Sequence, residues 1–203
     1  MGLREEKKQA TRSALAWAAI RLIVERGYDR VLVEDIAKEA GVSPRTFNNY
    51  FGSKAEAVAS RHLDRVVRVA DSLRQRPAGE PLWDALTHAV LEQLKPGPEV
   101  TAHPVPDREA WVAGLRRMME VPAIQAETLR AGADAESAIA AAVAERTGTD
   151  PATDLYPNLV AATVLAAHNV ASQSFLATTQ GIGPLITDAL RQIAAGLPPP
   201  HRS

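Results

Sequence analysis

The 203-residue sequence predicts an all-α protein, and two observations support this fold class. Apolar residues recur at helical spacing along most of the chain, while glycine and proline fall mainly between these stretches and no alternating strand pattern of useful length is found. Aromatic residues make up only 4% of the chain and alanine is abundant, which favours helices over strands. The predicted helices span residues 5–26, 33–40, 43–51, 54–74, 82–95, 107–120, 123–147, 152–179 and 183–195.

The second and third predicted helices have the features of a helix-turn-helix. Ala37 is small where two helices must cross closely, and Gly41 follows where the first of them has to end in a left-handed conformation. Ser43 can cap the next helix through its hydroxyl, and Pro44 suits the first helical position because its missing N–H would be unpaired anyway. This spacing predicts a DNA-binding head.

The third helix divides its residues between two faces. Phe47 and Phe51 are four residues apart, so both can face the core. The residues that then point away are Arg45, Thr46, Asn48 and Asn49. Arginine can make a bidentate contact to guanine and asparagine to adenine, so this outer face is suited to DNA.

Charge is distributed unevenly along the chain. The net charge is −1, but residues 1–54 carry +3 and residues 55–203 carry −4. A basic head attracts phosphate to one end of the molecule, which agrees with the helix-turn-helix. Cysteine is absent, which excludes disulfides and thiolate metal sites. The N-terminal residues lack the apolar core of a signal peptide, and the apolar stretch 159–167 is shorter than a membrane span, so we expect a cytoplasmic protein without membrane contact.

We expect a DNA-binding domain over 1–54, a helical body over 55–197 and a disordered tail over 198–203. The helix 152–179 carries two adjacent apolar stripes, one with Leu159, Ala162, Ala166 and Val170 and one with Val160, Val164, Ala167 and Ala171. One stripe can face the body and the other, together with 183–195, a second copy of the chain. A central core helix in a monomer is the alternative.

The first 54 residues closely resemble the TetR family of bacterial transcriptional regulators. The motifs that carry this resemblance are Val-Glu-Arg-Gly-Tyr-Asp, Asp-Ile-Ala-Lys-Glu-Ala-Gly-Val-Ser, and Thr46-Phe47 followed by Tyr50-Phe51 and Ser53-Lys54. The resemblance implies a homodimer that binds a palindromic operator, with the last two long helices at the dimer interface. The alanine-rich body is most similar to actinobacterial members, some of which respond to acyl-CoA esters.

The resemblance also implies roles for individual residues. Thr46, Tyr50 and Lys54 match positions that usually touch phosphates, and Arg45 and Asn49 match positions that often read bases. Lys7, Lys8 and Arg12 could add DNA contacts or could form a solvated face.

Three residues depart from the family pattern. Asn48 replaces a frequent aromatic residue and could read a base or bind water. Leu32 cannot cap the second helix, and Glu34 would repel phosphate unless it accepts from a cytosine amino group.

The leading hypothesis is a repressor that a small apolar or amphipathic molecule releases from its operator. Candidate ligand-binding residues are Trp83, Leu86, Val90, Trp111, Leu115, Met118, Met119 and His168, each of which could equally belong to the core. A DNA-binding architectural protein without a ligand is one alternative.

A metal-binding protein is another alternative, with His88 and Glu92 on one helix and His103 and His168 as possible neighbours. The sequence has no nucleophile elbow and no phosphate-binding loop, so we expect neither an enzyme nor a cofactor.

Overall fold

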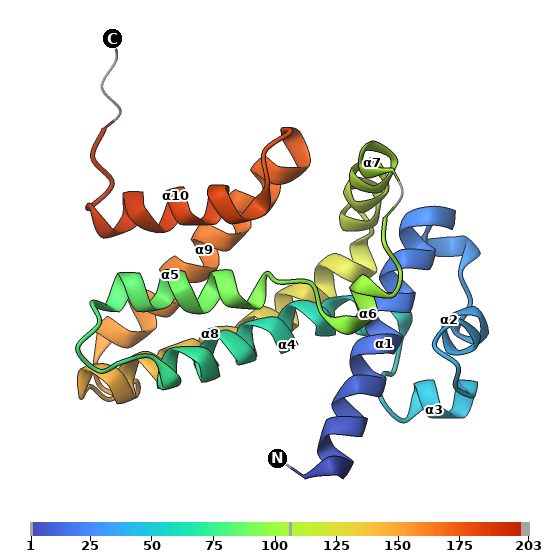
Figure 1. Cartoon of the computed structure of the whole chain (residues 1–203), viewed down its shortest axis with the longest axis horizontal. Coiled ribbons are helices and arrows are strands. Elements are labelled where there is room, and N and C mark those ends of the chain that lie inside the picture. The colour runs from blue at the N-terminus through green and yellow to red at the C-terminus, as the bar shows by residue number, and fades with distance from the viewer. Residues whose placement is uncertain (1, 106, 200–203) are drawn as a thin grey trace. The chain divides into compact units, whose positions relative to one another are not determined.

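The computed structural model describes residues 2–105 and 107–199, and in these ranges the regular structure is entirely helical (Figure 1). The α-helices are α1 (Leu3–Arg26), α2 (Val33–Glu39), α3 (Pro44–Asn48), α4 (Lys54–Gln75), α5 (Leu82–Gln93), α6 (Pro98–Thr101), α7 (Arg108–Met119), α8 (Pro122–Thr147), α9 (Leu155–Ala177) and α10 (Ile182–Ala194). A short 3₁₀ turn, η1 (Tyr28–Arg30), joins α1 to α2.

The predicted all-α fold is confirmed, and all nine predicted helices are present with ends shifted by three residues or fewer. The segment between α5 and α7, where no helix was predicted, contains the additional helix α6. Pro98 begins this helix, where a proline is well tolerated because its missing N–H has no partner in the first turn. Of the predicted tail, residues 198 and 199 have no regular structure and 200–203 lie outside the described residues.

The described residues form two compact units that are each discontinuous in sequence. The first unit combines the chain up to residue 64 with 96–132, and the second combines 65–95 with the chain from 133 onward. The domain boundary expected after residue 54 stays a prediction, while the division between these compact units falls inside α4 and α8. The reason is that α6 and α7 pack against α1 and so belong with the helix-turn-helix.

The first unit is organised around α1. Its buried core includes Leu15, Ile23, Ile36, Phe47 and Ile124. Helix α7 packs against α1 (Figure 1), and one glycine of α7 lies against the α1 backbone. A Cβ at Gly114 would come within 2.5 Å of Val24 Cγ1 and 2.6 Å of its carbonyl oxygen, so only glycine allows this approach.

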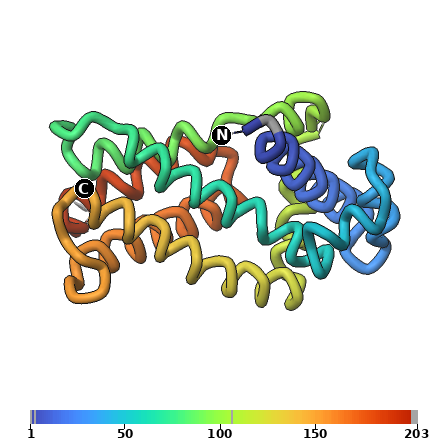
Figure 2. The backbone as a smooth tube through the Cα atoms, turned by 90° about the horizontal axis from the view of Figure 1, so that it is seen from below, coloured from blue at the N-terminus to red at the C-terminus, as the bar shows by residue number. Residues whose placement is uncertain are grey.

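The second unit is a bundle of α5, α9, α10 and the adjoining halves of α4 and α8, whose course Figure 2 shows. Helix α10 packs against both α5 and α9. The largest fully buried side chains of this unit are Leu73, Leu86, Ile139, Val143, Ile186 and Leu190.

The expectation of no membrane span rested on the apolar stretch 159–167, but the whole helix α9 (Leu155–Ala177) is long and apolar enough to cross a membrane, as judged by length and composition alone. The core helix of a bundle has the same composition, and Val160, Val164, Ala167 and Ala171 of α9 are buried within the second unit. We therefore interpret α9 as a bundle helix with one uncovered face, described below.

Candidate nucleic-acid interface

The turn between α2 and α3 is built as the sequence predicts. Gly41 has φ +70°, the left-handed conformation that ends α2. The backbone N–H of Val42 donates to the carbonyl of Ala37 at 2.9 Å and closes the helix end. The space around a Cβ at Gly41 is open, so the backbone angle, rather than crowding, requires glycine here.

The start of α3 is capped by a side chain. Ser43 Oγ accepts from the backbone N–H of Thr46 at 3.1 Å, and the two hydroxyl oxygens of these residues are 2.9 Å apart. Pro44 is the first helical residue. The predicted cap is therefore confirmed, and it fixes the direction in which α3 leaves the turn.

Helix α3 and the turn that follows it present polar side chains to solvent and bury two aromatic rings. Phe47 and Phe51 are buried, with ring centroids 5.6 Å apart. Arg45, Asn48 and Asn49 are exposed on the opposite side. Within the described ranges the Arg45 side chain makes no hydrogen bond or ion pair, so its guanidinium is available to a ligand outside the chain. The burial of Phe47 and Phe51 and the exposure of Arg45, Asn48 and Asn49 are confirmed, whereas Thr46 is half-buried and α3 ends at Asn48 rather than at Phe51. Base reading by these residues remains a prediction.

Lys54, a predicted phosphate contact, also holds the loop between α1 and α2. Its Nζ donates to the carbonyls of Tyr28 at 2.6 Å and Val31 at 2.9 Å, and lies 4.0 Å from the Tyr28 ring centroid. An ammonium has three N–H donors, so one remains for a phosphate. Burial, and secondarily the Asp29 carboxylate, raise the pKa of the Tyr28 phenol, which keeps it neutral. Tyr50, another predicted phosphate contact, is half-buried.

Arg12 fits neither of the two alternatives that the sequence left open. Its Nε lies 3.0 Å from Asp64 Oδ2, and its guanidinium lies 4.8 Å from the Phe51 ring centroid. Arg12 therefore links α1 to α4 inside the first unit. Lys7 and Lys8 are exposed on α1, and for them both alternatives stay open.

The start of α2 lacks a side-chain acceptor at its first flanking residue, as the sequence predicts, because Leu32 occupies that position. Asp35 offsets part of this loss, since its Oδ2 accepts from the backbone N–H of Leu32 at 2.9 Å. Leu32 is 60% exposed, and Glu34 beside it is exposed as well. This end of α2 thus presents an apolar and an acidic side chain to solvent.

The predicted ligand-binding residues divide between the two units. The second unit contains Trp83, Leu86, Val90 and His168, and the first contains Trp111, Leu115, Met118 and Met119. Leu86 and Met118 are buried in the cores of their respective units, and Met119 is exposed. Neither unit by itself brings all eight residues around one cavity.

Val90 and His168 do line a common cavity in the second unit. Its volume is about 20 Å³, which is room for about one water molecule. The other lining residues are Arg65, Val66, Val69, Leu94, Ile139, Val164, Leu165, Ile186 and Leu190. The sequence does not reveal these residues, because on an amphipathic helix a cavity wall has the same apolar pattern as a packed core.

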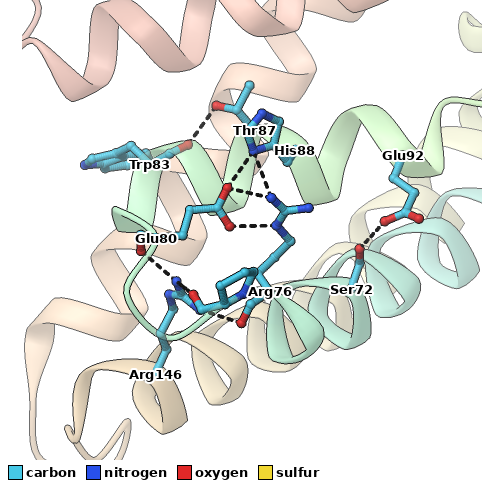
Figure 3. Close-up of polar contacts among 9 residues, drawn as sticks. Ser72, Arg76, Glu80, Trp83, Thr87, His88, Glu92 and Arg146 are labelled. Atoms are coloured by element: carbon cyan, nitrogen blue, oxygen red, sulfur yellow. Dashed lines mark hydrogen bonds and ion pairs between the residues drawn. The ribbon is translucent and has the colours of Figure 1, made fainter.

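A cluster of polar side chains fixes the turn between α4 and α5 (Figure 3). The Arg76 guanidinium donates to both carboxylate oxygens of Glu80 at 2.7 and 2.6 Å, and His88 Nδ1 lies 2.7 Å from the same carboxylate. Arg146 donates to the carbonyls of Arg76, Pro77 and Glu80. Hydrogen bonding to Arg76, and then to His88, lowers the pKa of Glu80 to about 2.

The residues proposed for a metal site have other partners. His88 pairs with Glu80, and Glu92 accepts from the hydroxyl of Ser72 at 2.6 Å (Figure 3). In the ranges 2–105 and 107–199, no group of three or more histidine or acidic residues is arranged to hold a metal ion. The structure thus gives this alternative no support.

Helices α9 and α10 share an uncovered apolar surface. Leu159 and Val170 on α9 are 59% and 60% exposed, and Ala162 and Ala166 of the same stripe are also exposed. Together with Leu185, Ile193 and Leu197, these residues line a broad groove of about 630 Å³. The other predicted stripe of α9 is the buried one, so the two stripes differ as the sequence analysis expected. We call this surface the α9–α10 face.

A capped helix-turn-helix with an exposed polar recognition helix defines a DNA-binding regulator. The family model described as bacterial regulatory proteins, tetR family, matches residues 17–59, and the model described as MftR C-terminal domain matches residues 80–198. The second match alone covers more than half of the chain. The chain therefore belongs to the TetR family of DNA-binding transcriptional regulators, with an MftR-type C-terminal domain.

Individual relatives agree with this assignment. The transcriptional regulator TcmR of Streptomyces glaucescens is 32% identical over 179 residues, which cover 86% of this chain and 76% of TcmR. MftR of Mycobacterium tuberculosis is 30% identical over 166 residues, covering 78% of this chain and 76% of MftR. These are regulators rather than enzymes.

Solved structures share the fold. A TetR-family regulator from Rhodococcus sp. has a TM-score of 0.57 at 24% identity, with 93% of this chain and 98% of that chain covered. Thermus thermophilus FadR, a TetR-family repressor solved with lauroyl-CoA, has a TM-score of 0.54 at 18% identity, with 94% and 97% covered.

Proposed function

We propose that this chain is a cytoplasmic homodimeric repressor that leaves a palindromic operator when a small apolar or amphipathic ligand binds. The observation that carries the dimer is the α9–α10 face, an apolar surface left uncovered in a single chain. Covering it with a second copy removes that surface from water. Two-fold pairing then presents two recognition helices to two half-sites.

The proposed DNA contacts follow the exposed side of α3. Arg45 and Asn49 read base edges in the major groove, and Asn48 contacts a base directly or through water. Thr46, Tyr50 and the remaining donor of Lys54 bind phosphate oxygens. Because Lys54 already holds two carbonyls, its contribution to affinity is smaller than that of a lysine with three free donors.

The ligand part of the proposal is supported by the apolar cavity beside Val90 and His168. With room for about one water molecule, this cavity must widen to admit a ligand, and a ligand that binds only the widened form shifts the equilibrium toward it. The lauroyl-CoA bound to Thermus thermophilus FadR makes a fatty acyl-CoA the first probe for this chain.

The DNA contacts are tested by fluorescence anisotropy with promoter fragments from the gene's own neighbourhood. Arg45→Ala should weaken binding to the preferred fragment by about 1–3 kcal/mol and flatten the preference between fragments, because a base contact is lost. Lys95→Ala, which removes an exposed cation from the second unit, is the matched control. Equal loss in the two variants, or no salt-sensitive binding to any fragment, contradicts the proposal.

The ligand is tested separately by adding lauroyl-CoA to the preformed protein–DNA complex and by thermal unfolding. Release of DNA together with a rise in melting temperature supports an effector. If neither lauroyl-CoA nor shorter or longer acyl chains change either measurement, the architectural protein without a ligand becomes the better explanation.

A further inference from the structure

The first unit contains a cleft that none of the DNA contacts uses. It lies between α1 and α7 beside their contact at Gly114, and its volume is about 420 Å³. Val24, Ala110 and Trp111 form apolar parts of its wall, and Arg21 and Arg117 contribute two guanidiniums. This volume falls within the range of small-molecule sites.

Trp111, the aromatic part of the cleft wall, packs against a second tryptophan, Trp17. The rings of Trp17 and Trp111 lie with centroids 5.4 Å apart at 51°. Trp17 is only 7% exposed, and Arg61 lies 5.0 Å over its ring while forming an ion pair with Glu99. Trp111 is thus a supported aromatic surface, against which a planar ring can pack without much rearrangement.

Donors in and beside the cleft lack acceptors. Among the described residues, two buried side-chain polar atoms have no hydrogen-bond partner, Trp17 Nε1 and Arg21 Nε, four residues apart on α1. The terminal nitrogen of Arg21 pairs with Glu39, while Arg117 makes no side-chain hydrogen bond or ion pair within 2–105 and 107–199. A buried donor without a partner is unfavourable. The Arg21 side chain is 26% exposed, so a shift of this side chain toward the cleft would let its Nε donate to a ligand's acceptor.

Two carboxylates also line the cleft, and they limit its positive charge. Asp107 is already used, since its Oδ1 accepts from the backbone N–H of Ala110 at 3.0 Å at the start of α7. Glu25 is exposed and has no side-chain partner in the described part of the chain, so it opposes an anion there.

We propose that this cleft binds a small planar aromatic carboxylate, with its ring against Trp111 and its carboxylate accepting from Arg21 Nε and Arg117. An anion supplies the missing acceptor at Arg21 and pairs with the free guanidinium of Arg117. The site is separate from the apolar cavity of the second unit and does not depend on it. Because Arg21 also pairs with Glu39 next to the end of α2, a ligand on Arg21 acts on the helix-turn-helix from within its own unit.

The test is isothermal titration calorimetry of the full chain, without DNA, with naphthalene-2-carboxylate and with its neutral analogue naphthalene-2-methanol. Arg117→Gln should weaken carboxylate binding about tenfold. Glu25→Gln should strengthen it about twofold, because an opposing charge is removed. Neither change should alter binding of the neutral analogue.

Arg65→Gln is the control for the second-unit cavity, and circular dichroism checks that each variant is folded. Weakening by Arg65→Gln but not by Arg117→Gln places the probe in that other cavity and overturns the proposal. Absence of saturable binding at millimolar probe overturns it as well. Since no DNA is present, either failure leaves the proposed operator binding untouched.

Discussion

The helix-turn-helix buries its large apolar side chains, whereas the α9–α10 face leaves its own exposed. In the helix-turn-helix, Phe47 and Phe51 are buried within one chain, and the side turned to solvent is polar. On α9 one apolar stripe is buried, while Leu159 and Val170 of the other stay exposed. The helix-turn-helix therefore buries its aromatic residues within one chain, whereas the second unit leaves an apolar surface exposed, against which the proposed second copy would pack.

The largest expected effect comes from adding charge to the uncovered surface. Val170→Glu should convert a dimer into monomers and lower operator affinity at least about a hundredfold, because a monomer engages one half-site instead of two. Analytical ultracentrifugation measures the oligomeric state, and anisotropy measures affinity. Leu129→Glu is the control, since Leu129 is 78% exposed on α8 but does not line the α9–α10 face. A dimer that persists in Val170→Glu would show that the α9–α10 face is not the dimer interface.

The next effect tests the buried aromatic residues of the helix-turn-helix. Phe47→Ala should lower the free energy of unfolding by about 3–5 kcal/mol, because it empties a fully buried ring position between α3 and the rest of the core. Urea denaturation followed by circular dichroism measures this change. Asn48→Ala, one residue along and exposed, should stay within about 0.5 kcal/mol of the parent protein. Similar losses in the two variants would mean that α3 is not anchored as described.

A smaller effect separates backbone conformation from packing. Gly41→Ala should cost about 1–2 kcal/mol, since alanine is strained at φ +70° although space for its Cβ is open. Gly132→Ala also meets open space, but it lies inside α8 and should stabilise by about 0.5–1 kcal/mol. The free energy of unfolding should therefore change with opposite sign in the two variants. A stabilising Gly41→Ala would show that the turn does not require glycine.

The sequence predicts the helices and the helix-turn-helix well because their determinants are local. Gly41, Ser43 and Pro44 act on residues within one or two turns, so their roles are visible without the tertiary structure. The second carbonyl contact of Lys54 and the pairing of Arg12 with Asp64 depend on residues about 23 and 52 positions away, and no local pattern indicates them. The candidate ligand residues stay a prediction, because apolar bulk alone does not distinguish a cavity wall from a core.

The smallest effect concerns the α4–α5 turn. Polar side chains fix this turn, whereas a glycine fixes the α2–α3 turn. The pKa of Glu80 is lowered from 4.5 to about 2 by Arg76 and His88. Its carboxylate therefore favours the folded state fully above about pH 4.5, and this contribution declines as the pH falls toward 2.

Glu80→Gln should accordingly reduce stability at neutral pH, and the difference from the parent protein should shrink between about pH 4.5 and 2. Urea denaturation midpoints of both proteins across this range measure the difference. Glu109→Gln removes an exposed carboxylate on α7 and should give a nearly pH-independent, small difference. If the Glu80 difference instead grew on acidification, the carboxylate would favour the unfolded state, and the turn would not be held by the Arg76–Glu80–His88 contacts.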